Sequence, residues 1–305
     1  MTLFDVYIAV DWSAAKTPGR GTGTIWIARR RRDETATVEN PVTRAAATDR
    51  VRELIDAAAD TGDRVLVGFD FAYGYPSGFA DAVTPGRAPP WRRVWDELDR
   101  LVVDEHDNRN NRHSVAAGLN DRLGRATFWG SGDAKLPATK PRAMPLPELR
   151  LVERELRRHG AHPKAVWQLS YAGSVGSQTL LGIPRVRSLR DDSRLAPLSA
   201  VWPFETGFSV PTDTQIVHAE IYPTIGAAGA RLHDVADAHQ VLSTVALCSE
   251  LDRDGSLGRL FGPPPGLDDA EAAIVSREEG WILGASPLLW RGAPSRQRIA
   301  PSMSA

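Results

Sequence analysis

Two aspartates directly follow two strongly apolar segments of the chain. Asp11 comes after the apolar run at 6–10, and Asp70 comes after the apolar run at 65–69. Continuous apolar runs of this length indicate strands that are covered on both faces of a sheet. Because ligands of open α/β sheets gather beyond the carboxyl ends of the strands, parallel neighbouring strands would bring Asp11 and Asp70 together at such a place.

Three more acidic residues lie late in the chain. Glu220 falls at the end of the next apolar segment, 215–221. The alternation of side chains along a strand does not determine to which face of the sheet Glu220 points. Asp234 and Asp237 are three residues apart at the start of a predicted helix, so both should project from one helix face near its N-terminus. We therefore expect these acids to meet Asp11 and Asp70.

Several carboxylates in one place repel one another unless cations lie between them. Carboxylate oxygens suit Mg²⁺ or Mn²⁺, and two such ions ~3.5–4 Å apart can stabilise the attacking water and the leaving oxygen of a phosphodiester displacement. The sequence therefore predicts a metal-dependent hydrolase. The expected metal ligands are Asp11, Asp70, Asp234 and Asp237, and the expected catalytic residues are these four and Glu220.

Two glycine-rich segments supply candidates for substrate binding. One is the segment 11–16, which precedes the glycines at 19–23. The other, 173–178, resembles a phosphate-cradling loop at a helix N-terminus, but it lacks the lysine of a P-loop, so a tight helix entry is the alternative. The candidate substrate-binding residues are Ser13, Lys16, Ser174, Ser177 and Gln178.

The acidic residues and one histidine also have structural interpretations. Asp11 and Asp70 could cap the loops after their strands, since aspartate is favoured there, and Asp234 and Asp237 could stabilise the positive end of a helix dipole. His233 is a candidate proton carrier because imidazole titrates near neutrality, yet histidines near helix starts also serve structural roles. The joint placement of four acids favours the metal site.

The periodicity of the sequence predicts the elements that position these residues. Alternating segments at 24–28 and 35–39 form, with the run at 6–10, an antiparallel meander. A helix at 49–60 leads to a strand at 64–70. Beyond a long insertion, a strand is predicted at 215–221 and helices at 234–251 and 268–279.

This order predicts an α/β fold of the RNase H-like class, in which helices flank a mixed sheet. The sheet is an antiparallel three-strand meander extended by two parallel strands. The insertion is rich in Pro, Gly, Trp and Arg and is too long for a structureless loop, so we expect a mostly helical cap. The predicted domains are a core of 1–73 and 212–285, an insertion at 74–211 and a flexible tail at 286–305.

Composition limits the function classes. A chain of 305 residues with 42% apolar and 25% charged residues is neither a stapled miniprotein nor wholly disordered. The single Cys248 excludes an intramolecular disulfide and a multi-cysteine metal site. Because no apolar segment reaches the ~20 residues of a membrane helix and the N-terminus lacks signal-peptide features, we expect a cytoplasmic protein without a membrane partner.

The charge distribution bears on the partner. Residues 85–190 carry 19 Lys and Arg against 11 Asp and Glu, although the net charge of the whole chain is -1. A basic region beside an acidic site suits an anionic substrate such as nucleic acid or another phosphate ester. The alternative is an arginine-rich, solvated helical insertion. The sequence specifies no protein partner.

Three segments carry a resemblance to known proteins: YIAVDWS at 7–13, GFDFAYGYP at 68–76 and EIYP at 220–223. They resemble the bacterial family called domain of unknown function 429, whose members are predicted nucleases of RNase H-like fold. The resemblance continues through 167–169, 173–178 and 202–205, and so covers most of the chain. It implies a metal-dependent nuclease that acts on DNA or RNA.

The arrangement of the acids resembles that of the RuvC-type resolvases. In those enzymes the acids sit on the first strand, the fourth strand and a late helix, and the segment 233–238 is similar to the late-helix motif. The resemblance implies catalytic roles for Asp11, Asp70 and Asp237. Asp70 replaces the glutamate that is usual in resolvases.

Three functions follow from these observations. The leading one is a nuclease or phosphodiesterase that hydrolyses nucleic-acid phosphodiester bonds. The second is an ATP-dependent phosphotransferase or ATPase of the actin and sugar-kinase type, because the segment 11–16 before a glycine-rich hairpin resembles a phosphate loop; that superfamily uses two RNase H-like domains, and strands for only one are predicted. The third is a non-catalytic nucleic-acid-binding module of the same fold.

Overall fold

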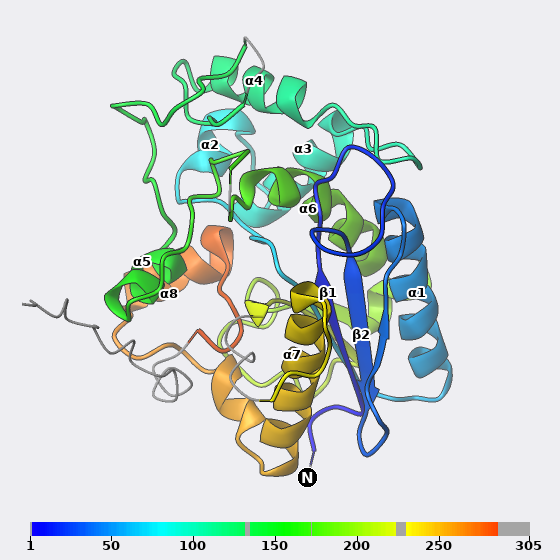
Figure 1. The fold of residues 1–305 in the computed structure, drawn as a ribbon. Helices are drawn as coiled ribbons and strands as arrows, with labels where there is room; N and C mark the ends of the chain where they lie inside the picture. Colours follow the sequence, from blue (N-terminus) through cyan, green and yellow to red (C-terminus); the bar gives the residue numbers. More distant parts are fainter. Residues whose placement is uncertain (1, 132–134, 172, 224–229, 286–305) are drawn as a thin grey trace, which may run out of the picture.

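A six-stranded mixed sheet organises the protein. The structure is a computed structural model that describes residues 2–131, 135–171, 173–223 and 230–285. The strand order is β3-β2-β1-β4-β6-β5, with β2 antiparallel to β1 and β3 and with β4, β6 and β5 parallel to β1 (Figure 1). The strands are β1 (Val6–Asp11), β2 (Trp26–Arg31), β3 (Thr37–Glu39), β4 (Val65–Phe69), β5 (Ser199–Val201) and β6 (Ile216–Glu220).

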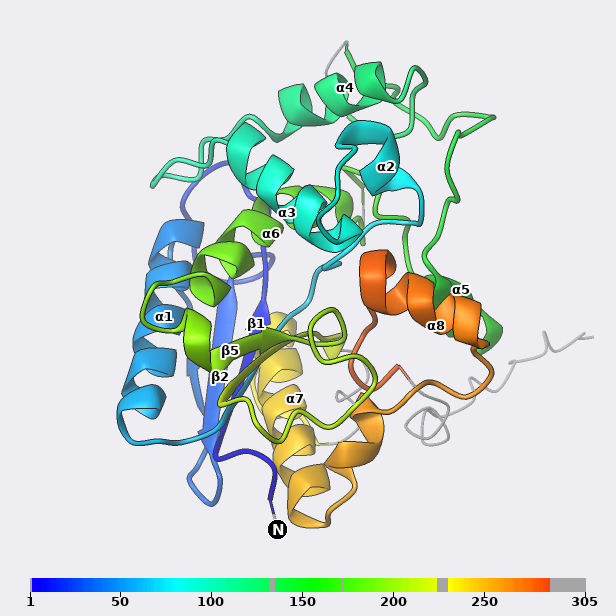
Figure 2. The ribbon, with the colours of Figure 1, turned by 180° about the vertical axis from the view of Figure 1, so that it is seen from behind.

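Helices cover both faces of this sheet. The helix α7 lies along one face, against β1 and β2, and α1 and α6 lie on the other (Figures 1 and 2). None of the helices in the described ranges combines the length and apolar composition that a bilayer crossing requires. The helices are α1 (Arg44–Asp60), α2 (Phe79–Val83), α3 (Pro90–Leu101), α4 (Arg112–Arg122), α5 (Leu151–Arg158), α6 (Gly176–Arg190), α7 (Ala236–Arg253) and α8 (Asp269–Ile274), with a π-helical turn at Val275–Glu279.

The alternation along β1 divides the core into two layers. Val6, Ile8 and Val10 belong to the apolar cluster that includes the buried faces of α1 and α6. Tyr7 and Ala9 belong to the cluster that includes α7. Because successive strand residues point to opposite faces, the next residue of the second set, Asp11, is directed to the face that α7 covers.

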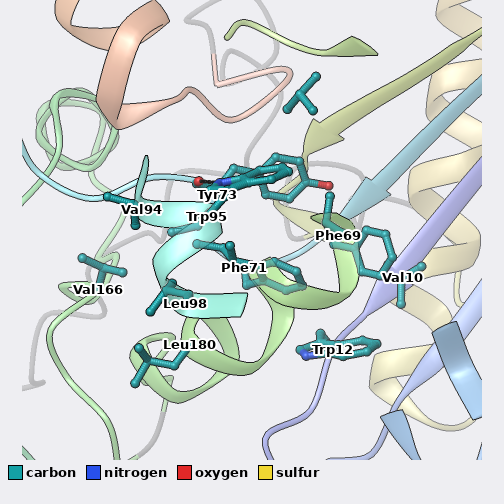
Figure 3. Close-up of a cluster of buried hydrophobic side chains, with 14 of the residues drawn as sticks. Val10, Trp12, Phe69, Phe71, Tyr73, Val94, Trp95, Leu98, Val166 and Leu180 are labelled. Carbon is teal, nitrogen blue, oxygen red and sulfur yellow. Dashed lines mark hydrogen bonds between the residues drawn. The ribbon is translucent and has the colours of Figure 1, made fainter. Parts of the chain in front are cut away.

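The first core layer continues beyond the sheet into the helices of the long insertion. Phe69, Phe71 and Tyr73 follow one another at every second residue after β4 and pack ring against ring (Figure 3). The indole Nε1 of Trp95, on α3, donates to the Tyr73 carbonyl at 2.7 Å. One apolar cluster therefore joins residues of the sheet to residues of the insertion.

The α/β class and the mixed sheet predicted from the sequence are confirmed, with one strand more than predicted. β5 lies within the range predicted as the insertion, and it pairs with β6 at the sheet edge. Within the range predicted as a mostly helical insertion, the structure has the helices α2 to α6. The predicted flexible tail at 286–305 lies outside the described residues.

The helix α1 begins at Arg44, five residues before the predicted start. Thr43 is its N-cap, and the Thr43 hydroxyl accepts a hydrogen bond from the backbone N–H of Ala46 at 3.2 Å. Arg44 is fully buried in ion pairs and hydrogen bonds with the segment 104–108. The start of α1 therefore combines a local cap with long-range contacts that a propensity pattern does not show.

Candidate active site

Asp11 and Asp70 lie side by side at the carboxyl ends of β1 and β4. The parallel register pairs Val10 with Phe69, and the backbone N–H of Asp70 donates to the Val10 carbonyl at 3.2 Å. The Asp70 Oδ1 accepts a hydrogen bond from the backbone N–H of Trp12 at 2.7 Å, which links the two strand ends.

Asp237 approaches this pair from α7, the helix that covers the sheet face to which Asp11 points. It lies in the first turn of α7, and its Oδ2 accepts a hydrogen bond at 2.6 Å from the backbone N–H of Gly23 in the turn between β1 and β2. The charges of both Asp70 and Asp237 act on Asp11. The fold thus brings together three acids that are 59 and 167 residues apart along the chain.

Burial and mutual repulsion raise the pKa of two members of this acidic cluster, which we define as Asp11, Asp70 and Asp237. Burial, followed by the charges of Asp70 and Asp237, raises the pKa of Asp11 to about 9. Burial also raises the pKa of Asp70 to about 7, with added repulsion from Asp237 and Glu220, while the N–H group of Trp12 opposes the rise. The cluster therefore favours either protons or a bound cation at neutral pH.

The side chains of the acidic cluster do not form a closed metal cage. In the ranges that the structure describes, no group of three or more His, Cys, Asp or Glu side chains meets the geometry of a metal site. Asp70 and Asp237 each direct one oxygen to a backbone N–H group. The chemistry of the donors nevertheless fits a hard divalent cation, because the groups are carboxylates and burial and repulsion raise the pKa of Asp11 and Asp70.

Glu220 has a different role from the other predicted acids. In the parallel register it pairs with Phe69, whose side chain points to the face opposite Asp11. Its carboxylate receives two hydrogen bonds from the Arg150 guanidinium, at 2.6 and 2.7 Å, and one from the backbone N–H of Tyr73 at 3.1 Å. Glu220 therefore closes a buried ion pair beside the acidic cluster.

Arg150 stands at the centre of a buried network. Its side chain is 1% exposed and contacts Glu153 and Glu220 as well as the Glu279 carbonyl. These bonds use all five guanidinium donors. The network joins α5, β6 and the π-helical turn, and α5 and α8 lie side by side in both views (Figures 1 and 2).

Asp234 and His233 lie outside the cluster. Asp234 is exposed and precedes α7, whose N-cap is Val235, so it does not share a helix face with Asp237 as the sequence predicted. His233 accepts a hydrogen bond at its Nδ1 from the backbone N–H of Val235 at 3.0 Å, and its ring packs on Trp26. These contacts make His233 part of the start of α7.

The predicted substrate-binding residues fall into three groups. Ser13 and Ser177 use their hydroxyls internally: Ser13 donates to the Gly23 carbonyl at 2.9 Å, and Ser177 donates to the Leu169 carbonyl at 2.7 Å. Lys16 is exposed in the loop between β1 and β2. The other two, Ser174 and Gln178, line a pocket next to the acidic cluster.

This pocket has a volume of about 370 Å³ and is bounded by residues from both sides of the sheet end. The amide of Gln178 donates to the carbonyl of Trp12, so the first turn of α6 is tied to the loop after β1. Asp70 belongs both to the pocket wall and to the acidic cluster. The polar and aromatic lining includes Asp70, Arg150, His162, Lys164, Tyr171, Ser174, Gln178, Glu220, Tyr222 and Gln240.

Sequence reasoning missed His162, Lys164, Tyr171 and Gln240 in this lining. Tyr171 lies two residues and Lys164 nine residues before the glycine-rich segment 173–178, and the Lys164 stem lies 3.8 Å from where a Cβ of Gly173 would be. The sequence did offer a signal for these two residues. A lysine and a tyrosine precede a segment that the sequence analysis had proposed for phosphate binding. Gln240 required knowledge of how α7 packs.

The loop after Asp11 is held by residues that are distant in sequence. Arg44 donates to the carbonyls of Ser13 and Ala15 at 3.2 and 2.7 Å, and the Asn108 amide donates to the Thr17 carbonyl at 3.2 Å. This bracing fixes the backbone that carries the Trp12 N–H group to Asp70. The sequence pattern contains no sign of these long-range contacts.

Ion pairs neutralise much of the basic region at 85–190. Its guanidinium groups contact carboxylates on neighbouring helices, such as Arg187 with Asp96 and Asp99. Lys164, in contrast, is exposed, with no ion pair to the residues that the structure describes. The Lys and Arg residues of this region that form ion pairs with described residues include Arg92, Arg93, Arg100, Arg109, Arg122, Lys140, Arg150, Arg158, Arg185, Arg187 and Arg190.

Comparison of the chain with family models, with curated proteins and with solved structures found no match. The resemblance to the domain of unknown function 429 family therefore stays a prediction. The acidic cluster and its adjoining pocket are therefore the features that bear on the function.

Proposed function

We propose that the protein is a metal-dependent phosphodiesterase that cleaves nucleic acid at the acidic cluster. The observation that carries this proposal is the meeting of Asp11, Asp70 and Asp237 at the carboxyl ends of two parallel strands, where burial and mutual repulsion raise the pKa of Asp11 and Asp70. A half-buried set of mutually repelling carboxylates is costly without a cation, and such perturbed groups concentrate at functional sites.

The strand order supports an RNase H-like interpretation of the fold. The antiparallel β3-β2-β1 meander is extended by the parallel strands β4 and β6, as the proposed class requires, and β5 adds one edge strand. The acids then sit on the first strand, directly after the fourth strand, and on a late helix. This distribution is the one expected from the resemblance to RuvC-type resolvases.

Asp11, Asp70 and Asp237 are the residues that would hold Mg²⁺ or Mn²⁺. A divalent ion bound there supplies Lewis-acid stabilisation of the charge that develops on a phosphodiester as it is hydrolysed. Glu220 has its carboxylate engaged by Arg150 and Tyr73, and in this proposal it braces the strand end rather than binding metal.

A cleavage screen tests this proposal. Labelled single-stranded, duplex and branched DNA and RNA are incubated with the protein in Mg²⁺, in Mn²⁺ and in EDTA, with ATP hydrolysis measured in parallel. We expect cleavage with either metal, none in EDTA, and none with Asp11→Asn. ATP hydrolysis without nucleic-acid cleavage would favour the phosphotransferase instead, and binding without any turnover would favour a non-catalytic module.

A further inference from the structure

The pocket beside Asp70 is well suited to one nucleotide. Its volume of about 370 Å³ lies at the lower end of the range of ~300–1,000 Å³ that small-molecule sites occupy. It combines a cation (Lys164), an aromatic ring (Tyr171) and two amides (Gln178 and Gln240). These groups match the phosphate, the π-face and the polar edge of a nucleotide.

Tyr171 is unusual in two independent respects. The residue is 64% exposed, although most of the large aromatic residues that the structure describes are buried. Its backbone has φ 79°, a left-handed conformation that costs energy for a residue other than glycine. The Tyr171 hydroxyl donates to the Ala138 carbonyl at 3.3 Å, which helps to hold the ring in place. The fold thus maintains an exposed ring at the pocket in spite of backbone strain.

Lys164 supplies a positive charge to the same wall of the pocket. Its aliphatic stem lies over Gly173, at the entry to α6, and its ammonium group has no ion pair to the described residues. Glu153 and Glu220 in the lining are already paired with Arg150. The carboxylate that remains in the lining is Asp70, so a phosphate would meet the Lys164 cation here without a competing free glutamate.

The pocket is connected to the acidic cluster through short contacts. Asp70 lines the pocket and accepts the Trp12 N–H group, while Gln178 donates to the carbonyl of Trp12. A nucleotide in the pocket therefore lies next to Asp70. Paired bases in a duplex are stacked on their neighbours and cannot lie against Tyr171 or enter the pocket without leaving the helix.

We propose that this pocket binds one unpaired nucleotide of a single-stranded nucleic acid, with its base stacked on Tyr171 and its phosphate near Lys164. The inference rests on the proposed function, because it assigns a substrate class to the same site. Stacking on an aromatic ring is tolerant of sequence, so the preference is for single strands rather than for one base. Tyr171 would stack on the base, and Lys164 would hold the phosphate through its positive charge.

Binding measured without cleavage tests the inference. Fluorescence anisotropy in EDTA compares a labelled single-stranded oligonucleotide, a blunt duplex of the same length and free AMP as competitor. We expect tight binding of the single strand, at least tenfold weaker binding of the duplex, and poor competition by AMP, because AMP lacks contacts beyond the pocket. Equal affinity for duplex and single strand, or competition by AMP at the concentration of the oligonucleotide, overturns the proposal.

Matched variants separate stacking from folding. Tyr171→Gly should fold at least as well as the native protein, since glycine adopts a positive φ without strain, yet bind the single strand about 5- to 150-fold more weakly. Tyr171→Phe keeps the ring and should keep most of the affinity. Lys164→Gln should reduce the slope of log affinity against log salt by about 0.7. Native affinity in Tyr171→Gly contradicts the stacking role.

The binding measurement and the cleavage screen can fail independently of each other. Single-strand binding that depends on Tyr171, with no metal-dependent cleavage of any substrate, leaves this inference standing and overturns the proposed nuclease activity. Cleavage with equal rates on single strands and duplexes, unaffected by Tyr171→Gly, has the opposite meaning: the nuclease is supported and the pocket assignment is wrong.

Discussion

Asp11 illustrates how the position of one residue sets its chemistry. It is the last residue of a strand whose other side chains are buried, and the fold adds the charges of Asp70 and Asp237 beside it. An acid whose pKa is raised to about 9 holds its proton in the folded protein at pH values where the unfolded chain has released it. Without a bound cation, the residue therefore destabilises the folded state.

This linkage predicts the pH dependence of stability. Because the pKa of Asp11 rises from its ordinary value of 3.8 to about 9 in the folded protein, the metal-free native protein should lose stability as the pH rises through that interval. Asp11→Asn lacks this titration, so its stability advantage over the native protein should grow with pH and level off above about pH 9. Urea unfolding in EDTA at about pH 5, 7 and 9 measures the difference. A difference that stays constant with pH contradicts the account.

At the scale of elements, α6 shows how tertiary packing overrides local preference. It contains Gly182 and Pro184, which normally weaken or interrupt a helix. The sequence indicated a helix start near 173–178 but gave no bounds for the helix. A Cβ at Gly182 would come within 2.3 Å of the Phe71 ring, so glycine permits the helix to approach the chain just after Asp70. The helix that supplies Gln178 thus depends on a residue unfavourable to helices.

Two glycine substitutions, one tight against Phe71 and one in open space, test whether packing on Phe71 requires glycine in α6. Gly182→Ala should destabilise the protein by ~1–3 kcal/mol because the Phe71 ring must move. Gly118→Ala, in α4, where a Cβ meets nothing within 4 Å, should stabilise it by ~0.5–1 kcal/mol through helix propensity alone. Denaturant unfolding at equilibrium gives both values. Equal effects at the two positions would show that packing on Phe71 does not constrain α6.

The buried network around Arg150 provides a second test at this scale. Arg150→Met leaves Glu153 and Glu220 without their cation and should cost ~3–5 kcal/mol of unfolding free energy. Arg154→Met, at an exposed position on the same helix, should change it by less than ~0.5 kcal/mol. Similar unfolding free energies for the two variants, again from denaturant titration, would contradict a bracing role for the network.

The whole molecule shows which features were accessible from sequence. The long apolar strands β1, β4 and β6 were predicted because burial on both faces leaves a continuous apolar pattern. The three-residue β5 was missed because so short a strand has no periodicity. Asp11 and Asp70 were recognised from the strands they end, whereas the pairing of Glu220 with Arg150 depends on contacts between residues 70 positions apart.

The same contrast holds for the remaining site residues. Asp237 meets the cluster because α7 begins at Ala236, and Asp234 is excluded because it precedes that start by two residues. A propensity pattern cannot locate a helix boundary to within two residues. The pocket residues Lys164 and Tyr171 come from a segment without regular structure, where no periodicity marks a position.

Metal binding by the acidic cluster is the central claim, and calorimetric titration with Mn²⁺ tests it most directly. We expect the native protein to bind Mn²⁺, Asp237→Asn to lose that binding, and Asp234→Asn, which removes an exposed acid outside the cluster, to bind as the native protein does. The absence of binding to the native protein, or equal binding by the two variants, would contradict the account.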